Sequence, residues 1–204
     1  MKKSFKVMLA VAMLFSATLS ANAQFSKKES NREPSRFHMG LRAGYTSTSY
    51  ITEYDLDAKN FVTGGLALDF QVAPIPIFVG MGLNYMNYGV MDSYYSKGTH
   101  YYYSELEDGV GIQMPITVSY HINVAPNLFI NPFFGGFVAY NNESGFGEDF
   151  NYGMRIGAGL NYGRLTFDMG YDLGLANLAG DDWNNDITSG TFFMTIGFNW
   201  AGSR

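Results

Sequence analysis

The residues best suited to acid–base or metal chemistry in this chain are its three histidines, His38, His100 and His121. His100 lies four residues before Ser104, but no third group is placed to orient the imidazole as a general base for a nucleophile. His38 and His121 are expected near the same end of two strands, where two histidines without an acidic third ligand make a poor metal site. We therefore expect no catalytic residues, no metal and no cofactor.

The acidic segment Asp181 to Asp186, with the sequence DDWNND, is a candidate cation site. It offers carboxylate and amide oxygens, but it lacks the ligand spacing and the closing glutamate of an EF-hand loop. A solvated acidic loop is therefore the favoured interpretation, and calcium binding stays an alternative.

The elements that must position such residues are eight segments in which large apolar residues alternate with small or polar ones. In the first, Phe37 to Tyr45, the residues Phe, Met, Leu, Ala and Tyr share one face, and His, Gly, Arg and Gly share the other. Such segments are long enough for tilted strands that cross a bilayer. We predict an all-β fold, an eight-stranded antiparallel transmembrane β-barrel, with strands near 37–45, 61–72, 76–88, 106–122, 127–140, 150–162, 164–176 and 190–200.

The links between these segments alternate in length. Short turns are expected at 73–76, 124–127 and 162–164, and long polar links at 47–60, 89–105, 141–150 and 177–189. The long links carry most of the acidic residues, whereas the apolar faces of the strands carry no charge. This alternation is typical of outer-membrane barrels, with short periplasmic turns and longer extracellular loops. Two prolines inside strands, Pro115 and Pro132, predict irregular ladders.

The N-terminus has the pattern of a cleaved secretory signal peptide over residues 1–23. Lys2, Lys3 and Lys6 precede an apolar stretch that is too short to span a membrane, and Ala21-Asn22-Ala23 forms an A-x-A cleavage site. Loss of the three lysines changes the net charge from −5 to −8, which argues against a nucleic-acid partner. The chain has no cysteine and so no lipoprotein anchor. We predict a flexible periplasmic leader at 24–36, the barrel at 37–200 and a tail at 201–204.

The second face of the strands is expected to line the barrel interior. An eight-stranded barrel is just wide enough for its side chains to fill it, and buried charges must be paired. We therefore predict an interior polar network, with a water- or proton-conducting path as the alternative. Its charged members are Arg42, Asp69, Arg155, Asp168 and Asp172.

The segment 94–104 is rich in tyrosine and is a candidate contact surface, because tyrosine supplies a large amphipathic area at low entropic cost. The favoured alternative is a loop that folds over the barrel mouth or extends the outer aromatic girdle. The candidate contact residues are Tyr94, Tyr95, Tyr101, Tyr102, Tyr103 and Trp183.

Three segments resemble the PorT-like family of outer-membrane β-barrels: Gln113 to Tyr120 with its internal proline, Tyr171 to Asn177, and the closing strand Phe192 to Trp200. Unlike the usual aromatic end of such barrels, Ala201 to Arg204 follow Trp200. The resemblance implies an outer-membrane location and, for some members, a link to protein secretion, and it supplies no catalytic residues.

The expected partners are outer-membrane lipids, the barrel-insertion machinery and a surface or secretion-system protein. The favoured function is a structural or surface-interaction role through the extracellular loops, without catalysis. The alternatives are an accessory role in secretion, a membrane-embedded barrel enzyme, and a soluble lipocalin-like carrier. The carrier would place Arg42, Asp69, Arg155 and Asp168 on the outer surface.

Overall fold

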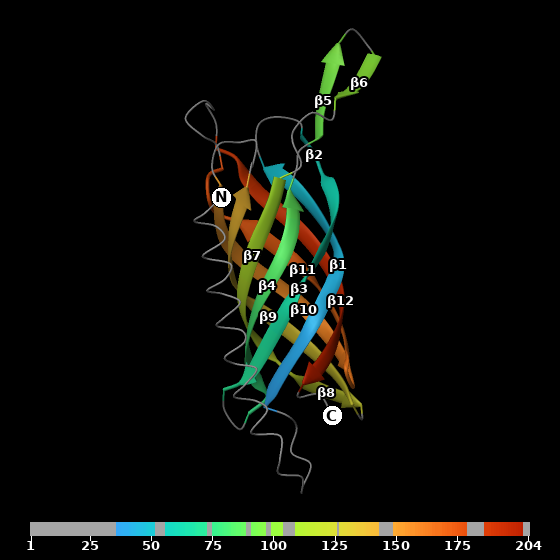
Figure 1. Cartoon of the computed structure of the whole chain (residues 1–204), viewed down its shortest axis with the longest axis vertical. Coiled ribbons are helices and arrows are strands. Elements are labelled where there is room, and N and C mark those ends of the chain that lie inside the picture. The colour runs from blue at the N-terminus through green and yellow to red at the C-terminus, as the bar shows by residue number, and fades with distance from the viewer. Residues whose placement is uncertain are drawn as a thin grey trace, which may run out of the picture. The chain divides into compact units, whose positions relative to one another are not determined.

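The computed structural model describes residues 36–51, 56–72, 75–88, 91–96, 99–103, 109–125, 127–142, 149–178 and 186–201. In these residues eight strands form a closed antiparallel barrel (Figure 1), which confirms the predicted fold. β1 pairs with both β3 and β12, and this closes the wall. The wall strands are β1 (Phe37–Ile51), β3 (Lys59–Gln71), β4 (Ile77–Tyr88), β7 (Gly109–Tyr120), β9 (Leu128–Asn142), β10 (Phe150–Tyr162), β11 (Leu165–Gly174) and β12 (Thr188–Ala201).

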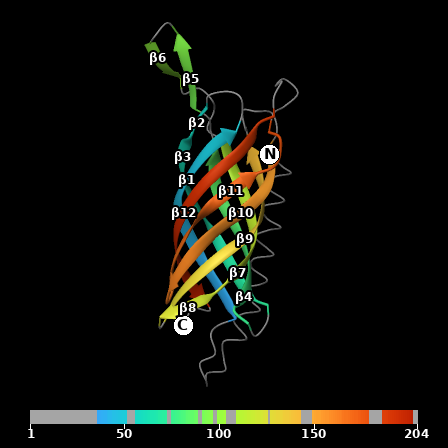
Figure 2. The same cartoon turned by 180° about the vertical axis from the view of Figure 1, so that it is seen from behind.

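A further short strand, β8 (Ile122–Ala125), continues the line of β7 and, among the described strands, pairs with β9 alone. Figure 2 shows β8 at the end of the barrel where the short turns lie. No helix long and apolar enough to cross a membrane is present in the described part of the chain.

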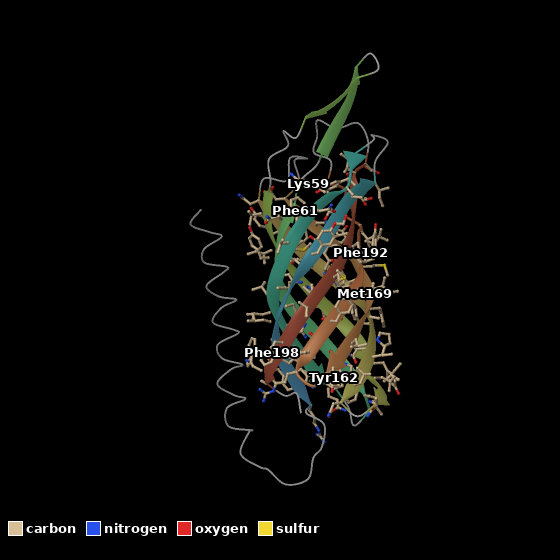
Figure 3. The ribbon with its side chains drawn as sticks, turned by 90° about the vertical axis from the view of Figure 1, so that its right-hand side faces the viewer. Lys59, Phe61, Tyr162, Met169, Phe192 and Phe198 are labelled. Atoms are coloured by element: carbon tan, nitrogen blue, oxygen red, sulfur yellow. The ribbon has the colours of Figure 1, made fainter. Side chains whose placement is uncertain are left out.

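The outer surface of the wall is apolar. Burial alternates residue by residue along β7, as a strand with one inner and one outer face requires. Large hydrophobic residues on the outer face are widely exposed, for example Ile156 at 66% and Ile196 at 61%. Figure 3 shows the side chains of Tyr162, Met169 and Phe198 on this surface. Such a face suits contact with lipid tails.

The predicted link at 47–60 is shorter than expected. β1 continues to Ile51 and β3 begins at Lys59, with the two-residue strand β2 (Leu56–Asp57) between them. The polar residues of the TSTSY segment are typical of a loop. In the structure, however, their burial alternates and they pair with β12. The hydroxyls of Thr48 and Thr191 lie 3.0 Å apart inside the barrel, so this polar segment is an inward-facing extension of the wall.

The predicted link at 89–105 also contains strands. β5 (Met91–Ser96) and β6 (Thr99–Tyr103) form a hairpin, and β2 adds to the edge of β5. β7 begins at Gly109 within the predicted strand 106–122, and residues 106–108 of that prediction lie outside the described residues. The long links therefore build a separate three-stranded sheet, β2-β5-β6, rather than loops alone.

The two internal prolines lie beside gaps in otherwise regular ladders. The β4–β7 pairing omits the pair that would join Pro115 to Gly82 and the pair after it, and then resumes in the same register. The β7–β9 pairing ends at Ser119, just before Pro132 would be paired, and the ladder resumes in β8. These gaps confirm the expected irregularity, since proline has no backbone N–H to donate.

Candidate functional site

The barrel interior contains an ion pair between the neighbouring strands β10 and β11. Arg155 donates from Nε to Asp172 Oδ1 and from Nη2 to Asp172 Oδ2, each at 2.6 Å. Gln113 on β7 donates to the same carboxylate at 2.9 Å and accepts from Arg155 at 2.7 Å. Asp172 and Arg155 are neighbours in the β10–β11 ladder, which fixes the bidentate geometry. The carboxylate is 2% exposed, so its charge depends on this pairing.

Aromatic rings fill the lumen beside this ion pair. The Arg155 guanidinium lies 4.3 Å from the ring centre of Phe193, and the Phe193 ring stacks on Phe133 at 6.3 Å. Glycines make room for the rings: a Cβ at Gly157 would lie 2.5 Å from Phe133, and one at Gly170 would lie 2.7 Å from Phe193. These two aromatic residues were not among those predicted for the interior, although both fall in the inward register.

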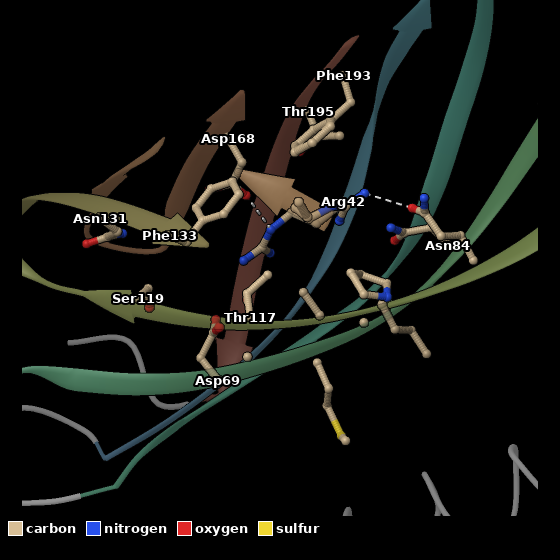
Figure 4. Close-up of a pocket in the computed structure, with 18 of the residues that line it drawn as sticks. Arg42, Asp69, Asn84, Thr117, Ser119, Asn131, Phe133, Asp168, Phe193 and Thr195 are labelled. Atoms are coloured by element: carbon tan, nitrogen blue, oxygen red, sulfur yellow. Dashed lines mark hydrogen bonds and ion pairs between the residues drawn. The ribbon is translucent and has the colours of Figure 1, made fainter. Parts of the chain in front are cut away.

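A second ion pair lies closer to the turn end of the barrel. Arg42 on β1 donates from Nε to Asp168 on β11 at 3.1 Å (Figure 4). It also donates from Nη1 to Asn199 on β12 at 2.9 Å. The side chains of Arg42 and Asp168 are 10% and 24% exposed. This contact is longer and less buried than the Arg155–Asp172 pair. The five charged residues predicted for the interior are therefore divided between two ion pairs and one remaining carboxylate, Asp69.

The two histidines predicted near one end do meet there. His38 and His121 stack at 6.0 Å, and Phe78 lies 3.8 Å from the ring centre of His121. Ser119 lies 3.2 Å from His121 Nε2, but no acidic group contacts the ring among the described residues. No group of three metal-ligating side chains occurs in the described part of the chain. The cluster is a packed aromatic layer with one polar contact.

A cavity of about 120 Å³ runs between these layers. Both arginines line it, as do Asp69 and Asp168 (Figure 4). These four residues therefore face the interior, which is the opposite of what a lipocalin-like carrier would require. The barrel interior therefore contains paired charges and a cavity with room for a few small molecules or ions.

The residues predicted for surface contact lie on the separate β2-β5-β6 sheet or outside the described residues. Tyr94 and Tyr95 are in β5, and Tyr101, Tyr102 and Tyr103 are in β6. His100 is also in β6, where it pairs with Tyr95.

The acidic link at 177–189 is described only at its two ends, and Trp183 and Ser104 lie outside the described residues. Asp186 accepts a hydrogen bond from Asn177 at 2.6 Å, and Asn177 in turn accepts one from the Ile187 N–H at 3.0 Å. These contacts close the base of the link.

A family model described as the outer membrane protein beta-barrel domain matches residues 22–180. No curated protein matches the sequence. Among solved structures, the outer membrane protein OprG from Pseudomonas aeruginosa is 11% identical, with a TM-score of 0.49 over 81% of this chain and 97% of that one. Neisserial surface protein A is 12% identical (TM-score 0.44; 82% and 99%), and the attachment invasion locus protein Ail of Yersinia pestis is 14% identical (TM-score 0.39; 80% and 98%).

Proposed function

Because this chain belongs to the family of outer membrane protein beta-barrel domains, we propose that it is a non-catalytic barrel whose extracellular end binds a protein partner. Within that family, the segments 113–120, 171–177 and 192–200 support a PorT-like barrel. The short turns would face the periplasm and the long links the outside of the cell.

The observation that carries this proposal is the β2-β5-β6 sheet (Figure 1). It is built from the links between β1 and β3 and between β4 and β7, so it stands at the loop end of the barrel. β6 pairs only with β5 in the described residues, which leaves its other edge unpaired. An unpaired edge offers backbone donors and acceptors to an incoming strand, and the sequence supplies tyrosines for contact.

The absence of catalysis is supported by the way the interior groups are used. The charged groups are paired, Arg155 with Asp172 and Arg42 with Asp168. Among the described residues, no acidic group orients His121 in its contact with Ser119. The enzyme alternative would require a nucleophile and base on the surface. Unchanged hydrolase activity after replacement of His100 would count against it.

Site-specific photo-crosslinking on intact cells tests the partner proposal. A photoreactive residue at Tyr102 in β6 should give an adduct of higher mass, whereas the same residue at the lipid-facing Tyr171 should not. Replacement of residues 91–103 by a short turn should abolish the adducts of neighbouring loop positions while the barrel still folds. No adduct from any position in β5 or β6 would contradict the proposal.

A role in protein secretion is the second candidate, and the PorT-like resemblance favours it. Deletion of the gene should then lower the amount of secreted protein in the medium, and the hairpin deletion should do the same. Normal secretion in both strains, together with adducts at Tyr102, would leave the surface-binding function alone.

A further inference from the structure

The two ends of the barrel differ in the charges that they expose. Among the residues whose side chains the structure describes, the exposed acidic side chains are Asp149 and Asp186, and both belong to the long links. The exposed arginines are Arg36 and Arg164, and both lie at the end with the short turns. The described part of the turn end therefore presents positive charge without an exposed acid to pair with it, and this favours an anionic partner.

Arg164 lies in the turn between β10 and β11, beside the end of β12. Its carbonyl oxygen accepts a hydrogen bond from the Asn199 N–H at 2.8 Å, and this bond places the turn next to the residue that precedes Trp200. The Arg164 side chain is exposed, and it makes no hydrogen bond or ion pair with the described residues. Its guanidinium is therefore available to a ligand at the surface.

The neighbours of Arg164 on the outer face are apolar or amphipathic. Tyr162 pairs with Leu165 in the β10–β11 ladder, and Leu165 pairs with Phe198 in the β11–β12 ladder. The exposed fractions of Tyr162, Leu165 and Phe198 are 59%, 52% and 46%. Figure 3 shows Tyr162 and Phe198 at the same end of the barrel. Such side chains can contact acyl chains, while the tyrosine hydroxyl can donate at the level of the lipid headgroups.

A β-bulge sets the position of Trp200 beside this turn. In the β1–β12 ladder Asn199 pairs with Gly40, whereas Ala201 pairs with the preceding residue, Met39. Trp200 is therefore an extra residue in β12, without a partner on β1. Bulges of this kind redirect a side chain. The Trp200 side chain is 39% exposed on the outer face, where its indole N–H can donate to a headgroup.

We propose that Arg164, Trp200 and Tyr162 bind the phosphate of an anionic phospholipid, such as phosphatidylglycerol, in the leaflet that meets the short turns. The Arg164 guanidinium pairs with the phosphate, because its planar fork of donors matches the phosphate oxygens. The indole and the phenol add neutral donors, and Leu165 and Phe198 contact the acyl chains. A zwitterionic lipid binds less well, because its ammonium group finds no exposed acid among the described residues at this end. The site requires the barrel to lie in a membrane, but it does not depend on a partner at the loop end.

Quenching of tryptophan fluorescence by brominated lipids tests the site in phosphatidylcholine vesicles that contain the folded barrel. The chain has two tryptophans, so Trp183→Phe leaves Trp200 as the reporter. At low ionic strength and equal mole fraction, brominated phosphatidylglycerol should quench Trp200 more strongly than brominated phosphatidylcholine, because one interfacial arginine favours an anionic lipid about fivefold. Arg164→Gln in this background should remove the preference, and Arg164→Lys should retain part of it.

Lys59→Gln in the same background is the matched control. It removes the same charge at the loop end, where the Lys59 ammonium lies 5.4 Å from the centre of the Phe61 ring, and it should keep the preference. Faster migration of the unheated sample on a gel shows that each variant is folded. Equal quenching by the two brominated lipids when Arg164 is present would overturn the proposal. A preference that persists in Arg164→Gln would also overturn it and would assign lipid selection to other groups of the barrel.

Discussion

Replacement of Asp172 by alanine should destabilise the barrel strongly, because it leaves a guanidinium in the lumen without its carboxylate. The change removes two bonds from Arg155 at 2.6 Å and one from Gln113 at 2.9 Å. Breaking a buried ion pair costs about 3–5 kcal/mol. Arg155 also lines the cavity, where water can hydrate it in part, so we expect the low end of this range.

Asp168→Ala provides the comparison on the same strand. Asp168 accepts one hydrogen bond, at 3.1 Å, and its side chain is 24% exposed. Loss of a charged hydrogen bond in this more open position should cost about 1.5 kcal/mol, half of the expected effect at Asp172 or less.

Urea-induced unfolding in lipid vesicles, followed by the mobility of the folded and unfolded forms on a cold gel, measures both variants. The double variant Arg155→Met, Asp172→Leu removes both charges and should recover most of the lost stability, because it leaves no unpaired ion. Equal losses in Asp168→Ala and Asp172→Ala, or a double variant as unstable as Asp172→Ala, would show that the pairing does not control stability.

Further predictions concern the wall and its turns. Ile156→Arg, in the middle of β10 and 66% exposed, should cost about 2–4 kcal/mol in vesicles, measured by the same unfolding assay. Gly157→Ala should lower the unfolding midpoint because its Cβ would lie 2.5 Å from the Phe133 ring, and an unchanged midpoint would contradict the observed packing. Gly163→Ala should cost about 1–2 kcal/mol, because Gly163 has a φ of 58° in the β10–β11 turn. A loss of stability smaller than that caused by a glycine-to-alanine change within a β-strand would argue against this turn geometry.

The faces of the wall strands could be predicted because a period of two residues assigns alternate side chains to opposite sides. This is why Arg42, Arg155 and the three aspartates all lie inside, as their register indicates. The pattern does not say which inward residues meet. That depends on the stagger between strands, which brings Gln113 of β7 across the lumen to Asp172 of β11 although 59 residues separate them.

The aromatic filling of the lumen escaped prediction for a related reason. Phe133 and Phe193 fall in the inward register, but an apolar residue there looks like an interruption of the polar face. The two rings pack against glycines on neighbouring strands, such as Gly157 and Gly170. The sequence alone does not show that these glycines lie against the rings.

The strand extensions were missed because polar residues usually indicate loops. Residues 46–51 contain only one large aliphatic side chain, and the segment 91–103 contains none of the strict apolar alternation of the wall. In the structure both segments pair through backbone hydrogen bonds, and the first turns its threonines toward the lumen. The apolar pattern therefore covers only part of β1, and it does not extend to β5 and β6, which lie outside the barrel wall.

Fractionation of the outer membrane, followed by gel electrophoresis of unheated and boiled samples, tests the central claim most directly. A closed barrel in the outer membrane should sediment with that membrane and migrate faster when it is not heated, because the folded barrel stays compact in detergent. A protein found in the soluble periplasmic fraction with a single mobility would contradict the barrel in the membrane.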